Sequence, residues 1–118
     1  LQRGRFRLGV NGAGVVQVVE GQLAYFGPNA GGAVALSELA VVSLDNRRSP
    51  SRWVLCQPGV HDLEIPVNAI GAEALFDAFA ALPEFPVDVM LQQLRHPSDN
   101  KVVIWRSTGS IPQFRLED

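Results

Sequence analysis

The amino-acid sequence predicts a mainly β, α+β fold in which a small sheet is closed by one amphipathic helix. Runs of β-branched and aromatic residues, separated by glycine, proline and asparagine, fill most of the first 67 residues, as expected for strands joined by turns. The spacing of apolar residues then changes to a helical period over 69–82. A length of 118 residues fits a single domain, 1–118.

The expected strands are short, and several of them alternate apolar with polar residues. They are Arg5–Val10, Val15–Val19, Gln22–Phe26, Ala33–Leu36, Leu39–Leu44, Arg52–Gln57 and His61–Val67. Glu20-Gly21 predicts a tight hairpin, because such turns need residues that accept positive φ. Ser37-Glu38 predicts a corner, and the polar residues 45–51 predict a loop.

The helix is predicted over Ala69–Leu82, with Asn68 as its N-cap and Pro83 as its stop. Its apolar stripe has the spacing i, i+3, i+4 and i+7, and consists of Leu75, Ala78, Phe79 and Leu82. A second, shorter helix is predicted over Val87–Leu94 by the same spacing. Lys101–Arg106 then predicts a last strand, with Val103 and Trp105 on one face and Val102 and Ile104 on the other.

Composition limits the function classes. A net charge of −2 without a clustered basic face argues against a nucleic-acid partner. The single cysteine, Cys56, excludes an internal disulfide and is expected in the core. No apolar stretch approaches the ~20 residues that span a bilayer. Because the chain begins at Leu1 and its first residues are rich in arginine, we expect a piece of a longer protein, at the cytoplasmic face of the inner membrane or in the cytoplasm.

Motifs that suggest catalysis or cofactor binding are weak. Residues 8–14 resemble the start of a dinucleotide site, but Gln17 stands at the third glycine position and Val15–Val19 would make a poor helix, so a hairpin turn is expected. His61 and His96 lack partners at metal-ligand spacing and are expected in solvated loops. The apolar strand around Cys56 should raise the pKa of its thiol. We therefore expect no metal and no cofactor.

Two acidic residues, Glu73 and Asp77, lie four apart on the predicted helix and are expected on its solvated side. Trp53 and Trp105 are expected as core or interface anchors.

Arginines supply the candidate ligand-binding site. Arg3, Arg5 and Arg7 share one face of the first strand, where guanidinium groups would hold a phosphate or an anionic lipid by charge-assisted hydrogen bonds. Arg47 and Arg48 lie in another loop and extend this patch if the fold brings them close. The alternative interpretation is an ordinary solvated strand face or a flank next to a membrane helix.

The chain resembles a bacterial pleckstrin-homology-like domain of an uncharacterised alphaproteobacterial family. Four segments carry the resemblance: Glu20–Pro28, Gly31–Leu39, Arg52–Leu55 and Ile65–Val67 with Gly71–Phe76. It covers residues 5–106 and implies a strongly bent antiparallel sheet, a partly open barrel, capped by the helix at 69–82. It also implies binding or scaffolding, with self-association in some members.

Two features depart from this family pattern. The first hairpin loop, Asn11–Gly14, carries no charge, whereas domains that bind phosphoinositides place basic residues there. The second helix and the strand Lys101–Arg106 exceed the simplest family plan. The alternative fold is a generic α+β sheet with both helices on one face, and the pairing of the last strand distinguishes the two.

Three functions remain open from the sequence. The first is a non-enzymatic interaction or scaffolding domain, the cytosolic part of a membrane-anchored protein, with a protein partner or a second copy as its ligand. The second is binding of an anionic lipid or a phosphate ligand through the arginines, with membrane contact only through a segment upstream of Leu1. The third is an enzyme with an unfamiliar site, which would need a deep polar pocket.

Overall fold

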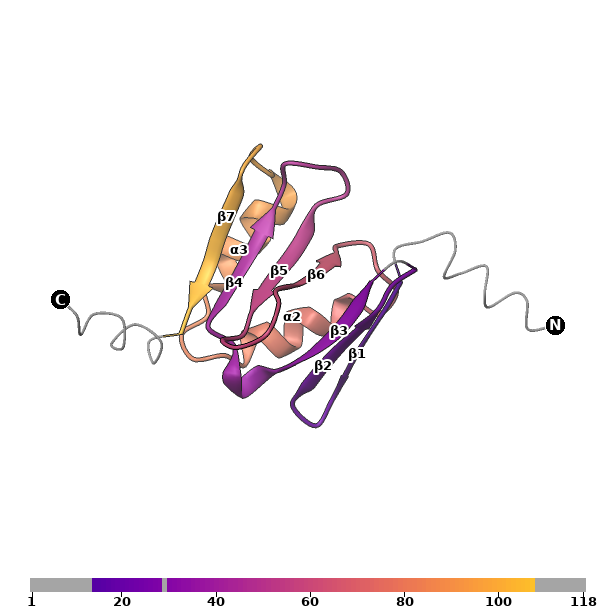
Figure 1. Cartoon of the computed structure of the whole chain (residues 1–118). Coiled ribbons are helices and arrows are strands. Elements are labelled where there is room, and N and C mark those ends of the chain that lie inside the picture. The colour runs from indigo at the N-terminus through magenta and orange to yellow at the C-terminus, as the bar shows by residue number, and fades with distance from the viewer. Residues whose placement is uncertain (1–13, 29, 108–118) are drawn as a thin grey trace.

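The computed structural model describes residues 14–28 and 30–107 and contains two antiparallel sheets and two α-helices (Figure 1). The first sheet has the order β1-β2-β3, and the second has the order β6-β5-β4-β7. The strands are β1 (Val15–Val19), β2 (Gln22–Phe26), β3 (Gly31–Ala35), β4 (Val41–Asp45), β5 (Arg52–Cys56), β6 (Leu63–Pro66) and β7 (Lys101–Arg106). The predicted mainly β, α+β class is therefore confirmed.

A tight turn connects β1 to β2, as predicted. Val19 pairs with Gln22, and both intervening residues have positive φ, 51° at Glu20 and 82° at Gly21. Two residues with positive φ match the twist of the flanking strands. Since Val15–Val19 forms a strand, the glycine at position 14 precedes no helix of the kind that a dinucleotide site needs.

The strands divide into two sheets at a corner. The short 3-10 helix η1 (Leu36–Glu38) turns the chain after β3, and the backbone N–H of Leu36 donates to the carbonyl of Gly21 at 2.8 Å. Strand β4 then pairs with β5 on one edge and with β7 on the other. Because both edges of β4 are occupied, β3 does not pair with it. In the described part of the chain no closed barrel forms.

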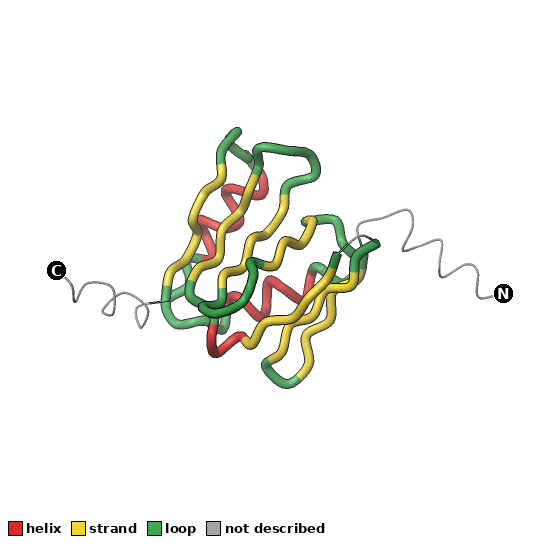
Figure 2. Tube along the Cα trace, in the orientation of Figure 1, coloured by secondary structure: helices red, strands yellow, loops and turns green. Residues whose placement is uncertain are grey.

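The last strand thus pairs within the second sheet, which revises the picture of a barrel with a helical cap. Helices α2 (Glu73–Ala80) and α3 (Val87–Arg95) lie on the same side of this sheet (Figure 2). This placement of the helices agrees with the alternative α+β arrangement. Strand β3 lies beside β6 without ladder hydrogen bonds, and Gly32 faces Leu63 there.

Helix α2 is shorter than the predicted Ala69–Leu82, because the residues before Glu73 bind β1 instead. Ile70 makes a parallel bridge to Val15, and the N–H of Val16 donates to the carbonyl of Ile70 at 2.8 Å. Gly71, which follows this bridge, has a φ of 86°. The residue at the N-cap is Ala72, so the prediction of Asn68 there is wrong.

The core lies between the two sheets and the helices. All four residues of the predicted α2 stripe are buried, and Phe79 packs against Trp53 of β5 with ring centroids 5.0 Å apart. In α3 only Met90 is buried, whereas Val87 and Leu91 of the predicted stripe are exposed. One hydrophobic cluster includes residues of both sheets and both helices.

Strand β7 departs from the predicted alternation. The register between β4 and β7 shifts between Val42 and Ser43, so Trp105 pairs with Val42 but Val103 pairs with Ser43. A bulge of this kind places two successive side chains on one face. Ile104 and Trp105 are consequently both buried, and Val103 is exposed.

Candidate functional site

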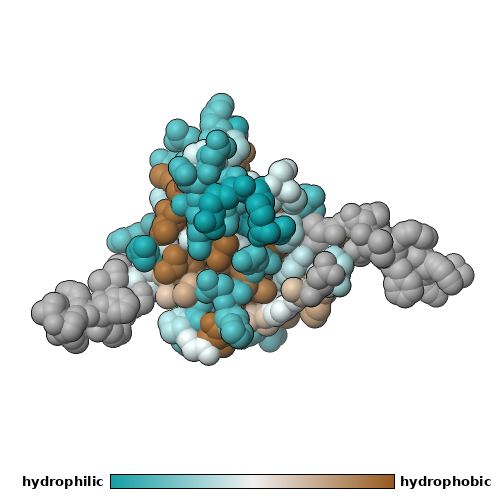
Figure 3. All heavy atoms as spheres, turned by 45° about the horizontal axis from the view of Figure 1, so that its top comes forward, coloured by the Kyte–Doolittle hydropathy of each residue, from teal (hydrophilic) through white to brown (hydrophobic). Residues whose placement is uncertain are grey.

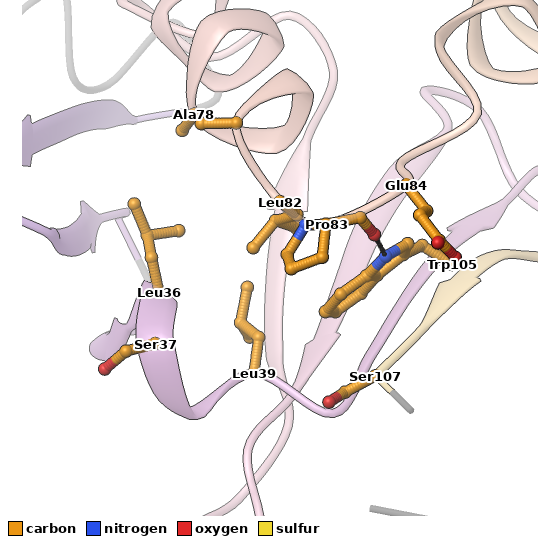
Figure 4. Close-up of a pocket in the computed structure, with 10 residues that line it drawn as sticks. Leu36, Ser37, Leu39, Ala78, Leu82, Pro83, Glu84, Trp105 and Ser107 are labelled. Carbon is orange, nitrogen blue, oxygen red and sulfur yellow. Dashed lines mark hydrogen bonds between the residues drawn. The ribbon is translucent and has the colours of Figure 1, made fainter. Parts of the chain in front are cut away.

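Three segments far apart in the sequence enclose an apolar groove of about 440 Å³ (Figure 4). They are η1 with Leu39, the end of α2 with residues 81–84, and the end of β7 with Ser107. The lining consists of Leu36, Ser37, Leu39, Ala78, Ala81, Leu82, Pro83, Glu84, Trp105 and Ser107. We call this surface the Trp105 groove.

Buried side chains form the base of the Trp105 groove, and partly exposed ones form its walls. Leu39, Leu82 and Trp105 are buried, while Leu36 is half-buried and Pro83 is exposed. In Figure 4 Leu36 lies across the opening from Trp105, and the residues of α2 lie above Leu39. The groove is therefore lined mainly by apolar side chains, some of them exposed to solvent.

One hydrogen bond fixes the indole of Trp105. Its Nε1 donates to the carbonyl oxygen of Pro83 at 2.8 Å (Figure 4). The bond satisfies the polar end of the indole and leaves its apolar body to line the groove. The bulge in β7 turns the side chain of Trp105 toward the groove. With strict alternation, Trp105 would lie on the same face of the strand as the exposed Val103.

Among the described residues of this lining, Glu84 alone has an ionisable side chain. It is exposed and has a φ of 60°, a left-handed conformation that is uncommon for residues other than glycine, asparagine and aspartate. Ser37 and Ser107 add hydroxyl groups to the lining. The groove therefore presents apolar contact area, two hydroxyls and one negative charge.

The predicted arginine site is only partly within the described residues. Arg3, Arg5 and Arg7 lie outside them. Arg47 and Arg48 belong to the β4–β5 loop, which lines a separate polar hollow of about 340 Å³ with residues 97–99. Figure 3 shows hydrophilic side chains covering this end of the second sheet.

Both loop arginines already face carboxylates. The Arg47 guanidinium donates from Nε to Oδ1 and from Nη2 to Oδ2 of Asp45, each at 2.9 Å. Arg48 Nη2 lies 3.6 Å from Oε1 of Glu64. A bound anion would compete with these carboxylates for the two positive charges, so an anion gains less here than at an unpaired arginine.

Arg47 holds the pKa of the Asp45 carboxyl well below its usual range, first through the side-chain hydrogen bonds and then through its backbone N–H, which lies 3.0 Å from Oδ1. The same interactions raise the pKa of Arg47. Nearby, Asn46 accepts a hydrogen bond from Ser51 at 2.6 Å. This network shapes the loop itself rather than leaving it open for a ligand.

His61, His96, Glu73 and Asp77 are all exposed, as the sequence predicted. Cys56 was expected in the core, but it is only half-buried at the end of β5. Burial, and then the charge of Asp62, raise the pKa of its thiol, as expected for an unreactive cysteine. Residues 14–28 and 30–107 contain no group of three metal-ligating side chains close enough to hold an ion. None of their helices is long and apolar enough to cross a membrane.

Sequence reasoning did not identify the Trp105 groove, because its walls come from segments about 40 and 20 residues apart along the chain. Trp105 was the one available signal. It was expected as a core or interface anchor, and it is both buried and part of the base of the groove.

Comparisons with protein-family models, curated proteins and solved structures found no match to this chain.

Proposed function

We propose that the chain is a non-enzymatic interaction domain with a pleckstrin-homology-like fold that binds a short peptide segment of a partner protein in the Trp105 groove. The peptide carries apolar side chains followed by an arginine or a lysine. The observation that carries this proposal is the apolar groove itself, with its buried base and its single carboxylate at Glu84.

Shape and charge each define part of the ligand. Leu36, Leu39 and Trp105 offer apolar area, and each buried leucine-sized side chain contributes about 1.5–3 kcal/mol. The carboxylate of Glu84 favours a cation beside the apolar residues. A groove of this size accommodates a few side chains, and the entropy lost on association offsets part of the gain. For an empty groove we expect a dissociation constant on the order of 100 µM, equivalent to about −5.5 kcal/mol.

A direct titration tests this proposal. The probe is a short fluorescein-labelled peptide with two leucines and a following arginine, and its controls replace the leucines with serine or the arginine with glutamate. Fluorescence anisotropy with the full chain should show saturable binding of the probe and much weaker binding of both controls. Equal binding of all three peptides would contradict the proposal.

Variants then locate the binding site. Leu36→Ser should weaken binding of the probe about tenfold, because the substitution removes apolar area from one wall of the groove. Glu84→Gln should weaken it about two- to fivefold, as expected for an exposed ion pair. The matched controls are Val19→Ser, an exposed apolar residue outside the groove, and Asp88→Asn, an exposed acid of α3. Neither control should change the affinity.

A further inference from the structure

The chain leaves the described region at the Trp105 groove. Ser107 is the last described residue, it lines the groove, and its backbone N–H donates to the carbonyl of Ala40 at 2.8 Å. This bond anchors the start of the following segment beside Leu39. Whatever follows Ser107 therefore begins at the edge of an apolar surface.

The sequence of residues 108–118 matches the ligand chemistry inferred above. It contains three large apolar residues, Ile111, Phe114 and Leu116, with Arg115 among them. Three small residues, Thr108, Gly109 and Ser110, separate the first apolar residue from Ser107. An apolar surface with one carboxylate thus lies next to a segment that carries apolar side chains and one arginine, with the acidic residues Glu117 and Asp118 after them.

Chain length permits contact. An extended chain spans roughly 3.3–3.6 Å per residue, so Ile111 reaches up to about 14 Å from Ser107 and Phe114 up to about 25 Å. A connection of only a few residues gives an attached segment an effective concentration in the millimolar range. A groove that binds such a peptide with a dissociation constant near 100 µM would then be occupied mostly by its own segment.

We propose that residues 108–118 occupy the Trp105 groove of the same chain and compete with the partner peptide. This inference rests on the proposed function, because it assigns a second ligand to the same groove. The interaction is weak and intramolecular, so a partner peptide at sufficient concentration displaces the segment. The ratio of millimolar effective concentration to a dissociation constant near 100 µM makes the apparent affinity for a peptide about tenfold weaker than that of an empty groove.

The test uses the full chain with the double substitution Ile111→Ser and Phe114→Ser. The variant should bind the leucine–arginine probe about tenfold more tightly than the unmodified chain. In NMR spectra without peptide, the methyl groups of Leu36 and Leu82 and the indole N–H of Trp105 should shift between the two proteins. The matched control is Gln113→Ala, which lies within the same segment and should leave both readouts unchanged.

The outcomes separate this inference from the proposed function. If the double variant binds the probe with the affinity of the unmodified chain and its groove signals do not shift, the inference is wrong and the proposed function stands. If the double variant binds no probe, the proposed function is wrong. If the shifts depend on protein concentration, the segment belongs to a second copy, and the intramolecular form is wrong.

Discussion

At the scale of single residues, Asp45 shows how a loop is fixed by charge. Its side chain is mostly buried and accepts three hydrogen bonds from Arg47, two from the guanidinium and one from the backbone. The exposed guanidinium limits what the pair adds to stability, because water screens it. The main effect is that Arg47 is held at one position beside β4.

The lowered pKa of Asp45 predicts a dependence of stability on pH. An unfolded aspartate titrates near 3.9, whereas the native carboxyl remains charged at lower pH. The unfolded state therefore binds more protons below about pH 4, so this contribution is fully present at higher pH and is lost as the pH falls through the acidic range. Urea unfolding at pH 7 and at pH 3 measures the change in free energy of unfolding.

In Asp45→Asn the decline in stability between pH 7 and pH 3 should be smaller than in the unmodified chain. Asp88→Asn, which changes an exposed acid of α3, serves as the control and should keep the original decline. An identical decline in Asp45→Asn and in the unmodified chain would show that the Arg47 interaction does not perturb Asp45.

At the scale of elements, the stretch before α2 attaches the first sheet to the helix. The N–H of Ile70 donates to the carbonyl of Gly14, and the N–H of Val16 donates to the carbonyl of Ile70, both at 2.8 Å. Gly71 makes this close approach feasible, since a Cβ at this position would lie 2.5 Å from the carbonyl oxygen of Val16. This contact between the stretch before α2 and β1 therefore depends on glycine at position 71, which needs no room for a Cβ and readily adopts a positive φ.

Gly71→Ala should lower the free energy of unfolding by about 2–4 kcal/mol, because it adds a steric conflict to the strain of positive φ. Gly59→Ala is the matched control, since Gly59 has a φ of 91° but nothing within 4 Å of the added Cβ. It should lose only about 1 kcal/mol. Equal losses in chemical denaturation would show that the contact with Val16 is not tight.

Elements were the level at which the sequence was most informative. Strand Lys101–Arg106 has the predicted bounds, and the Glu20-Gly21 turn has the predicted form, because both depend on local spacing and local φ preferences. The helix start was wrong, because residues before Glu73 gain more from hydrogen bonds to β1 than from an extra helical turn. That competition involves a distant strand and leaves no mark on local periodicity.

Strand pairing was less predictable. Nothing in the apolar pattern of Val41–Asp45 indicates that β7, about 60 residues later, takes its second edge. Since that pairing separates the two sheets and also places Trp105 at the groove, the same long-range contact explains both what was missed in the fold and what was missed in the site. The arginines, by contrast, were visible in the sequence, but their carboxylate neighbours Asp45 and Glu64 became evident only in the structure.

At the scale of the whole molecule, both sheets share one core. Leu23 of β2 and Trp53 of β5 belong to the same hydrophobic cluster, and Phe79 of α2 contacts Trp53 on one side and Phe85 on the other. Because neither sheet has a separate core, we expect them to unfold in one transition. The groove then keeps its shape only when the entire domain is folded.

Phe79→Ala should lower the free energy of unfolding by about 3–5 kcal/mol, as expected for a fully buried aromatic residue. Phe76→Ala, on the partly exposed side of the same helix, should cost less than about 1 kcal/mol. Urea unfolding can be followed at both sheets, because the single tyrosine lies in β2 and the two tryptophans lie in β5 and β7. Separate midpoints for tyrosine and tryptophan signals would contradict the shared core.

The most direct measurement of the central claim is an NMR titration of the isotope-labelled full chain with the leucine–arginine peptide. We predict saturable shifts at the methyl groups of Leu36, Leu39 and Leu82 and at the indole N–H of Trp105, with little change at Val16 in the first sheet. Shifts confined to the loop of Arg47 and Arg48, or no saturable shifts at the Trp105 groove, would contradict the account.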